Sequence, residues 1–201
     1  LERGAKRVLL SAPGKNVDRT VVFGVNDNTM QKSDRMISNG SCTTNCLAPM
    51  AKVMHDAVGI ESGLMTTIHS YTGDQPTLDR RHSALIPTST GAAKALGEVL
   101  PALKGKLDGT AMRVPTPNVS AVDLTFTASR AVTVEEINAA ALAAAIGPMK
   151  RVLGYDPEQK VSIDFNHTEE SCIFAPDQTI VVAGRTVRVL GWYDNEWAFS
   201  V

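Results

Sequence analysis

The chain has 201 residues, of which 43% are hydrophobic and 20% charged, and its net charge at neutral pH is −1. This composition is typical of a globular protein with a sizeable core, and it provides neither the basic surface that nucleic-acid binding requires nor an acidic tail. Three cysteines do not suggest a disulfide framework and no apolar run could span a bilayer, so we expect a cytosolic protein without a signal peptide.

The first forty residues have the pattern of strands that belong to a larger unit. Residues 8–11 predict a short buried strand that ends at Pro13-Gly14, and residues 20–25 predict a second strand of β-branched and aromatic character. The sequence enters the first strand almost at once, so we expect the complete protein to begin upstream. We therefore interpret residues 1–40 as the end of a preceding domain.

Residues 41–58 carry apolar side chains at helical spacing and are followed by Gly59. Pro49 complicates this helix, because a proline inside a helix removes one backbone hydrogen bond and usually bends the axis. Two interpretations remain open: a regular helix begins near Pro49, or the helix begins at Cys42 and bends at Pro49. We favour the second.

The remainder of the chain is rich in strands. Thr133 and Glu136 have the spacing of a capping box at the start of an alanine-rich helix that ends at Ile146. Strands in succession with few helices between them indicate an α+β domain with a mixed, largely antiparallel sheet and helices on one face. The other predicted elements are strands at 63–70, 119–128, 161–165, 171–175, 179–182 and 186–190, and a short helix that follows a turn at residue 90 and stops at Pro101.

Cys42 stands among small polar residues at the predicted start of a helix. The free N–H groups and the dipole at a helix N-terminus favour the thiolate, which is the nucleophilic form of cysteine. Ser41, Thr43 and Thr44 could add hydroxyl donors at the same place. The pattern therefore predicts a nucleophilic cysteine with a lowered pKa.

His69, near the end of the predicted strand 63–70, is the candidate partner of Cys42. An imidazole within hydrogen-bond reach would stabilise the thiolate and act as acid and base. On residue types alone, a cysteine and a histidine without chemistry are the commoner case. We interpret Cys46 and Cys172 as buried thiols; a structural zinc site built on Cys42, Cys46 and a histidine is a weak alternative, and we expect no metal.

Several polar residues could bind anions or amides, although each is also an ordinary turn or surface residue. Arg113 lies in a stiff extended segment, and its planar guanidinium suits a phosphate. Thr72, Thr90 and Gly91 occupy polar turns whose hydroxyl and N–H groups suit an anion. The amide of Asn195 could hold a planar amide ligand. The chain contains neither G-x-G-x-x-G nor a Walker-type phosphate loop.

Five segments, taken together and in this order, closely resemble the phosphorylating glyceraldehyde-3-phosphate dehydrogenase family. They cover nearly the whole chain, and their combination is very specific. The segments are SNGSCTTNCLAP at residues 38–49, MTTIHSYT at 65–72, IPTSTGAAKA at 86–95, RVPTPNVS at 113–120 and WYDNEW at 192–197.

The resemblance implies an enzyme that oxidises glyceraldehyde 3-phosphate to 1,3-bisphosphoglycerate in glycolysis. It implies that Cys42 attacks the aldehyde to give a thiohemiacetal, that hydride passes to NAD, and that inorganic phosphate cleaves the resulting thioester. It further implies that His69 activates the thiol and assists hydride transfer as a base. The backbone N–H of Cys42 would stabilise the oxyanion.

The resemblance also assigns the binding residues. Those implied for the attacking phosphate are Ser41, Thr43, Thr90 and Gly91. Thr72 and Arg113 are implied for the phosphate of the substrate, with Asp74 orienting the arginine. Asn195 is implied to bind the carboxamide of the nicotinamide.

The implied organisation has three parts. Residues 1–40 would be the last strands of an NAD-binding Rossmann domain, residues 41–195 the catalytic domain, and residues 196–201 the start of a C-terminal helix. The family is homotetrameric, which implies a homotetramer here. Between Asp79 and Ile86 the sequence is shorter than the family pattern, in a loop that helps to select NAD over NADP, so NADP remains open as the cofactor.

Two further alternatives remain. Erythrose-4-phosphate dehydrogenase shares the cysteine segment, but the run Thr90-Gly91-Ala92-Ala93-Lys94 favours the triose enzyme. A chain without its nucleotide-binding half could instead be a catalytically silent assembly domain.

Overall fold

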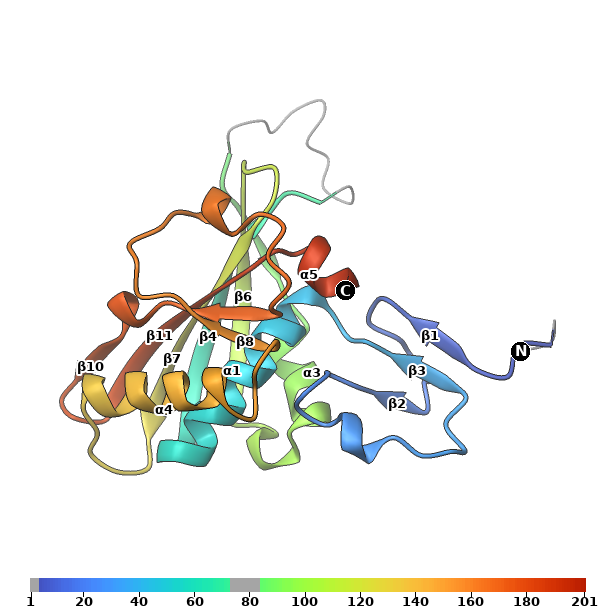
Figure 1. The fold of residues 1–201 in the computed structure, drawn as a ribbon, viewed down its shortest axis with the longest axis horizontal. Coiled ribbons are helices and arrows are strands. Elements are labelled where there is room, and N and C mark those ends of the chain that lie inside the picture. Colours follow the sequence, from blue (N-terminus) through green and yellow to red (C-terminus); the bar gives the residue numbers. More distant parts are fainter. Residues whose placement is uncertain (1–3, 73–83) are drawn as a thin grey trace.

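The computed structural model describes residues 4–72 and 84–201, which contain a small and a large β-sheet (Figure 1). The longer helices are α1 (Cys42–Val58), α3 (Ala92–Val99) and α4 (Val134–Ile146), and a short α5 (Trp197–Ser200) lies near the C-terminus. The strands are β1 (Val8–Leu10), β2 (Arg19–Thr20), β3 (Met36–Ser38), β4 (Ile60–Ser70), β5 (Ile86–Ser89), β6 (Leu107–Val114), β7 (Ser120–Ala128), β8 (Leu153–Tyr155), β9 (Cys172–Phe174), β10 (Ile180–Val182) and β11 (Thr186–Tyr193).

The large sheet is mixed. Its strands follow the order β5-β6-β4-β7-β11-β9-β8, and β10 pairs with β11. Only the β4–β6 and β8–β9 pairs are parallel; the other pairs are antiparallel. This arrangement confirms the predicted α+β class with a largely antiparallel sheet.

Helices α1, α3 and α4 cover one face of the large sheet (Figure 1). Helix α1 lies across the central strands, and α3 and α4 pack on either side of it. Alternation along β4 shows the two faces: Met65, Thr67 and His69 are buried toward the helices, whereas Leu64 and Ile68 are exposed. The core therefore lies between α1 and the sheet, and His69 belongs to its inner face.

Helix α1 begins at Cys42, as predicted. Gly40, with a φ of +70°, turns the chain out of β3, and the Ser41 side chain accepts a hydrogen bond from the Thr44 N–H, which caps the helix. The helix continues through Pro49 and ends at Gly59. The cysteine thus occupies the first helical position, where backbone N–H groups have no partner inside the helix.

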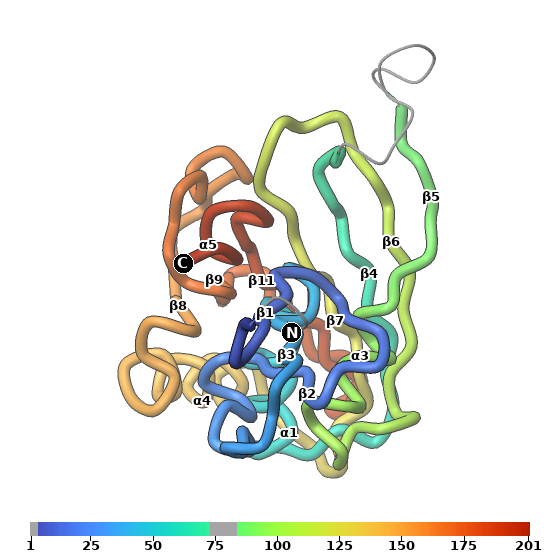
Figure 2. The backbone as a smooth tube through the Cα atoms, turned by 90° about the vertical axis from the view of Figure 1, so that its right-hand side faces the viewer, coloured from blue at the N-terminus to red at the C-terminus, as the bar shows by residue number. Residues whose placement is uncertain are grey.

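The small sheet consists of β1, β3 and β2, all parallel. Figure 2 shows it beside the helical face of the large sheet, next to α1 and α3. Val22, which follows β2, is fully buried in the main core, so the two sheets share a contact.

Two predicted strands were wrong. Residues 20–25 turn after Thr20 because the Asn26 side chain accepts from the Val22 N–H and donates to the Thr20 carbonyl. Residues 161–165 form a 3-10 helix, Ser162–Phe165, because the Asp164 carboxylate accepts from the Val161 N–H. The structure also adds strands β3, β5, β6 and β8, which the sequence pattern did not predict.

The other predicted elements form, but the strand predicted to be buried at residues 8–11 is not, since Leu9 in β1 is 70% exposed. The β10–β11 hairpin forms around Gly184, and β11 continues to Tyr193, beyond the predicted end. Thr133 caps α4 by accepting from the Glu136 N–H, as predicted. The Glu136 carboxylate, however, pairs with Arg130 rather than returning to the cap.

Gly191 on β11 provides a test of this packing. A Cβ at this position would lie 2.6 Å from the Cys172 sulfur and 3.3 Å from the sulfurs of Cys46 and Met50. We expect Gly191→Ala to lower the free energy of unfolding by about 1–3 kcal/mol, because the buried contact leaves no room for a methyl group. Chemical denaturation would measure this change. Thr186→Ala, at the exposed start of the same strand, should change it by less than about 0.5 kcal/mol.

Candidate active site

The residues singled out in the sequence converge on a cavity of about 260 Å³ between the starts of α1 and α3 and the ends of β4 and β6. No acidic side chain is found among the described residues that line it. The lining consists of Pro13, Ser41, Cys42, Thr43, Thr44, Thr67, His69, Ser89, Thr90, Gly91, Ala92, Ala95, Ala111 and Arg113.

Cys42 and His69 meet in this cavity. The Cys42 sulfur lies 3.5 Å from His69 Nε2, a hydrogen-bond distance for sulfur. Helix α1 brings the cysteine to its first helical position, and the inward face of β4 brings the histidine, which is only 4% exposed. The structure therefore places side by side a thiol and an imidazole that are 27 residues apart in sequence.

The ionisation of Cys42 differs from the sequence-based expectation. Burial is the largest influence and raises the pKa of the Cys42 thiol above its usual value. The backbone N–H and hydroxyl of Thr43 and the charge of Arg113 act in the opposite direction, but they do not outweigh burial.

Arg113 contacts His69 on the side away from the sulfur. Arg113 Nη1 lies 2.6 Å from His69 Nδ1 and 3.1 Å from the carbonyl oxygen of Ser70. Nδ1 also lies 2.8 Å from the carbonyl oxygen of Ser70, so this nitrogen contacts both a donor and an acceptor, and its role depends on the tautomer of the ring. The other ring nitrogen, Nε2, faces Cys42.

Tyr193 joins the helix that carries the cysteine to the strand that carries the histidine. Its hydroxyl lies 2.9 Å from the hydroxyls of both Thr43 and Thr67, and its ring makes an edge contact with His69 at 5.9 Å between centroids. Tyr193 is almost fully buried. Tyr193 belongs to the segment at residues 192–197, but no sequence pattern indicates its position between two polar residues of the site.

Three sources of positive potential meet at the cavity. The N-terminus of α1 contributes Ser41 and Thr43, the N-terminus of α3 contributes Thr90 and Gly91, and Arg113 adds a full charge. Their convergence makes the cavity suited to an anion. Thr72 lies just past the end of β4 and is not among the described residues that line the cavity. Asp74 lies outside the described residues.

Asn195 is buried beside the end of β4. Its side-chain oxygen accepts hydrogen bonds from the hydroxyls of Ser70 and Ser120, each at 2.8 Å. Its amide nitrogen makes no hydrogen bond with the described residues. Asn195 is therefore held rigidly through its oxygen, and its N–H groups are available to a ligand.

The other thiols do not join the site. Cys46 and Cys172 are fully buried behind Cys42, near Gly191. Within residues 4–72 and 84–201 no group of three metal-ligating side chains gathers. No helix in the described part of the chain has the length and hydropathy needed to cross a membrane. The predicted shortening between Asp79 and Ile86 lies mostly outside the described residues.

The whole chain is similar to known proteins. The family model for the glyceraldehyde 3-phosphate dehydrogenase C-terminal domain matches residues 41–195. The chain is 62% identical to glyceraldehyde-3-phosphate dehydrogenase of Cereibacter sphaeroides, 60% to that of Xanthobacter flavus and 54% to that of Geobacillus stearothermophilus. Each alignment covers the whole chain but 63% of the relative. The chain thus spans less than two thirds of these proteins.

Tyr193→Phe tests whether the tyrosine hydroxyl sets the distance between helix and strand. We expect the free energy of unfolding to fall by about 1–3 kcal/mol, because two buried threonine hydroxyls lose their shared partner. Alkylation of Cys42 by iodoacetamide should also become less sensitive to replacement of His69, because the two side chains are no longer held together. Denaturation and peptide mass spectrometry measure the two effects.

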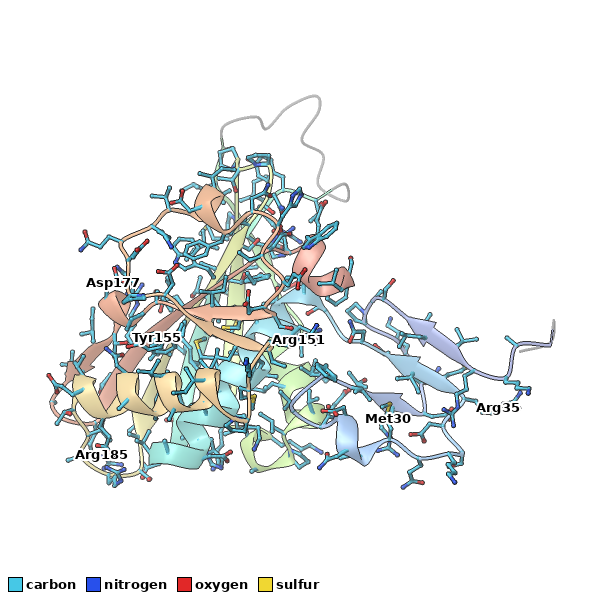
Figure 3. All side chains as sticks on the ribbon, viewed as in Figure 1. Met30, Arg35, Arg151, Tyr155, Asp177 and Arg185 are labelled. Carbon is cyan, nitrogen blue, oxygen red and sulfur yellow. The ribbon has the colours of Figure 1, made fainter. Side chains whose placement is uncertain are left out.

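Tyr155→Phe is the matched control. Tyr155, labelled in Figure 3, stacks on Phe174 in β9, and its hydroxyl makes no hydrogen bond with the described residues. Its loss should change the free energy of unfolding by less than about 0.5 kcal/mol. Equal effects of the two replacements would contradict the role given to Tyr193.

Proposed function

Because the chain belongs to the glyceraldehyde-3-phosphate dehydrogenase family, we propose that the protein containing it oxidises glyceraldehyde 3-phosphate and phosphorylates the product, with NAD as hydride acceptor. The observation that supports this best is the Cys42–His69 contact inside a cavity with the N-termini of two helices and one arginine. A nucleophilic thiol, an acid–base group and an anion-binding wall are what this reaction requires.

In the proposed reaction the Cys42 sulfur adds to the aldehyde carbon and forms a thiohemiacetal. The developing oxyanion is stabilised by the backbone N–H of Cys42, the first residue of α1. His69 takes the hydroxyl proton as hydride leaves, and a thioester to Cys42 remains. Inorganic phosphate attacks this thioester, releases the acyl phosphate and regenerates the thiol.

Two phosphate subsites are proposed. The attacking phosphate binds Ser41, Thr43, Thr90 and Gly91, where two helix N-termini converge. The phosphate of the substrate binds Arg113 and Thr72. Arg113 suits this role because its Nε is buried and has no hydrogen-bond partner among the described residues.

Asn195 is the described residue that fits the cofactor. Its oxygen is fixed by two serines and its amide nitrogen is available, so it would hold the nicotinamide carboxamide. When bound, NAD supplies the hydride acceptor. NADP is the alternative acceptor, and the same assay run with each dinucleotide distinguishes them.

The rest of the proposed organisation follows the family. Residues 1–40 would complete an NAD-binding domain, residues 41–195 form the catalytic domain, and residues 196–201 begin a C-terminal helix. A cytoplasmic homotetramer is proposed. The open face of the large sheet supports association, since Leu64 on β4 and Val182 on β10 are more than half exposed there.

Replacing the reacting residues tests the proposed chemistry in the complete protein. Cys42→Ser should abolish NADH formation, followed by absorbance, and the acyl adduct seen by intact mass, because no thioester can form. His69→Asn should lower the rate by about 10²–10⁴-fold, since acid–base catalysis is lost. Cys172→Ala, away from the cavity, should keep the activity. An active Cys42→Ser variant would refute the mechanism.

Arg113→Ala tests the phosphate subsite. We expect kcat/KM for glyceraldehyde 3-phosphate to fall about 100-fold, corresponding to about 3 kcal/mol for a charge-assisted contact. Unphosphorylated glyceraldehyde should show no such loss. Arg113→Lys should give an intermediate value, because lysine keeps the charge but not the planar fork. Equal losses for both substrates would remove Arg113 from this subsite.

A further inference from the structure

We propose that Asp194 is a positioning residue for cofactor binding: its carboxylate holds the turn that places Asn195 beside Ser70 and Ser120. This inference rests on the proposed function, in which Asn195 holds the nicotinamide carboxamide. The two serines fix the amide of Asn195, and Asp194 fixes the backbone that carries this amide.

The carboxylate of Asp194 joins three segments of the chain. Its Oδ1 accepts hydrogen bonds from the backbone N–H groups of Glu196 and Trp197, at 2.9 and 2.8 Å, within the turn that leads into α5. Its Oδ2 accepts from the backbone N–H of His167 and from the side-chain amide of Asn118, both at 2.8 Å. Four donors thus meet one carboxylate, and Asp194 is almost completely buried among them.

These hydrogen bonds keep the side chain of Asp194 ionised. Burial is the largest single influence, and by itself it would raise the pKa of the Asp194 carboxyl. The hydrogen bonds from the three backbone N–H groups and from Asn118 act in the opposite direction and together hold the pKa below its usual value. The carboxylate is therefore present at neutral pH, and hydrogen bonds to a charged acceptor are stronger than those to a neutral one.

The arrangement of the donors requires a carboxylate at this position. Three of the donors are backbone N–H groups, which cannot be reversed, and they approach both oxygens of Asp194. An asparagine has one oxygen and one NH₂ group. In either orientation its NH₂ group would face at least one backbone N–H, so that two donors would meet. Asp194→Asn therefore keeps the shape of the side chain but loses at least one bond that holds the turn.

The loop that donates to Oδ2 has a strained backbone. His167 has a φ of +63°, in the left-handed region that residues other than glycine seldom adopt. In this conformation its N–H donates to Asp194, and its ring lies 5.3 Å from the ring of Trp197 between centroids. A strained residue persists only where its surroundings hold it, and such residues cluster at ligand sites. The loop and the turn thus fix each other through Asp194.

The position of Asn195 depends on this turn, because it lies between Asp194 and Glu196 in the chain. Its amide oxygen accepts from the hydroxyls of Ser70 and Ser120, each at 2.8 Å. A displacement of the turn by about 1 Å would break both bonds, since hydrogen bonds weaken steeply with distance. The Asn195 amide would then have to be ordered again each time a cofactor binds.

The pair of Cys42 and His69 does not depend on this turn. These two residues lie on α1 and β4, and no hydrogen bond of Asp194 recorded for the described residues reaches either element. Loss of the carboxylate should therefore weaken binding of the dinucleotide and leave the reactivity of the thiol unchanged. A general loosening of the fold would change both.

The test compares Asp194→Asn with the unchanged complete protein. We expect the Kd for NAD, measured by calorimetry without aldehyde, to rise about 10- to 100-fold, because Asn195 is no longer held in place before the cofactor binds. The KM for NAD should rise by a similar factor, while kcat at saturating NAD should fall less than about threefold. Alkylation of Cys42 by iodoacetamide without NAD, followed by peptide mass spectrometry, should change by less than about twofold.

Asp156→Asn is the matched control. The Asp156 carboxylate also accepts a backbone N–H, that of Glu158 at 3.0 Å, but it lies in the loop after β8. Its replacement should leave the Kd for NAD unchanged. Asn118→Ala is a milder variant that removes one donor to Asp194 without bringing two donors together. It should raise the Kd for NAD about three- to tenfold, and it replaces Asp194→Asn in the test if that variant does not fold.

Two outcomes overturn the inference alone in a protein that oxidises the aldehyde: an unchanged Kd for NAD in the variant, or a parallel loss of NAD affinity and Cys42 reactivity. A complete protein that does not bind NAD would overturn the inference together with the proposed function. If NAD affinity depends on Asp194 in a protein that oxidises no aldehyde, the inference is supported and the proposed function is refuted.

Discussion

The packing of α1 across the centre of the large sheet is the constraint on which the site depends, because it brings the first residue of that helix to the inward face of β4. The helix is held by apolar burial: Leu47, Met50 and Met54 are completely inaccessible, and each contributes about 1.5–3 kcal/mol. Apolar contacts are not directional, so they fix the layer but not the last few tenths of an ångström. The distance between α1 and β4 is fixed more closely by the Tyr193 hydroxyl, which lies between Thr43 on the helix and Thr67 on the strand.

The anion-binding character of the cavity is local. The whole chain carries a net charge of −1, and no general positive field surrounds it. The potential comes instead from partial charges at the N-termini of α1 and α3 and from one guanidinium, all directed into a cavity with no acidic lining among the described residues. Partial charges on backbone N–H groups act over a short range, which suits the two phosphate subsites that we propose near one sulfur.

Burial of Cys42 has two opposite effects on its reactivity. It strengthens the interaction of Cys42 with its neighbours, yet it raises the pKa of the thiol, so the helix N-terminus alone does not produce a thiolate. Arg113 contacts the His69 ring, and its charge partly offsets the effect of burial on the pKa of Cys42.

Local sequence patterns were sufficient to predict several elements. These elements depend on residues within a few positions of each other; they are the cap and start of α1, the alternation of β4, the β10–β11 hairpin and the cap of α4. The selection of Cys42 and His69 as candidate site residues also began from the residues next to them in the sequence. Residues 20–25 and 161–165 carry strand-like side chains, but the side chains of Asn26 and Asp164 turn the backbone there. The distance from sulfur to imidazole, the bridging role of Tyr193 and the contact of Arg113 with His69 arise only in the folded chain. These depend on contacts between residues 27 to 150 positions apart, and no local pattern encodes such contacts.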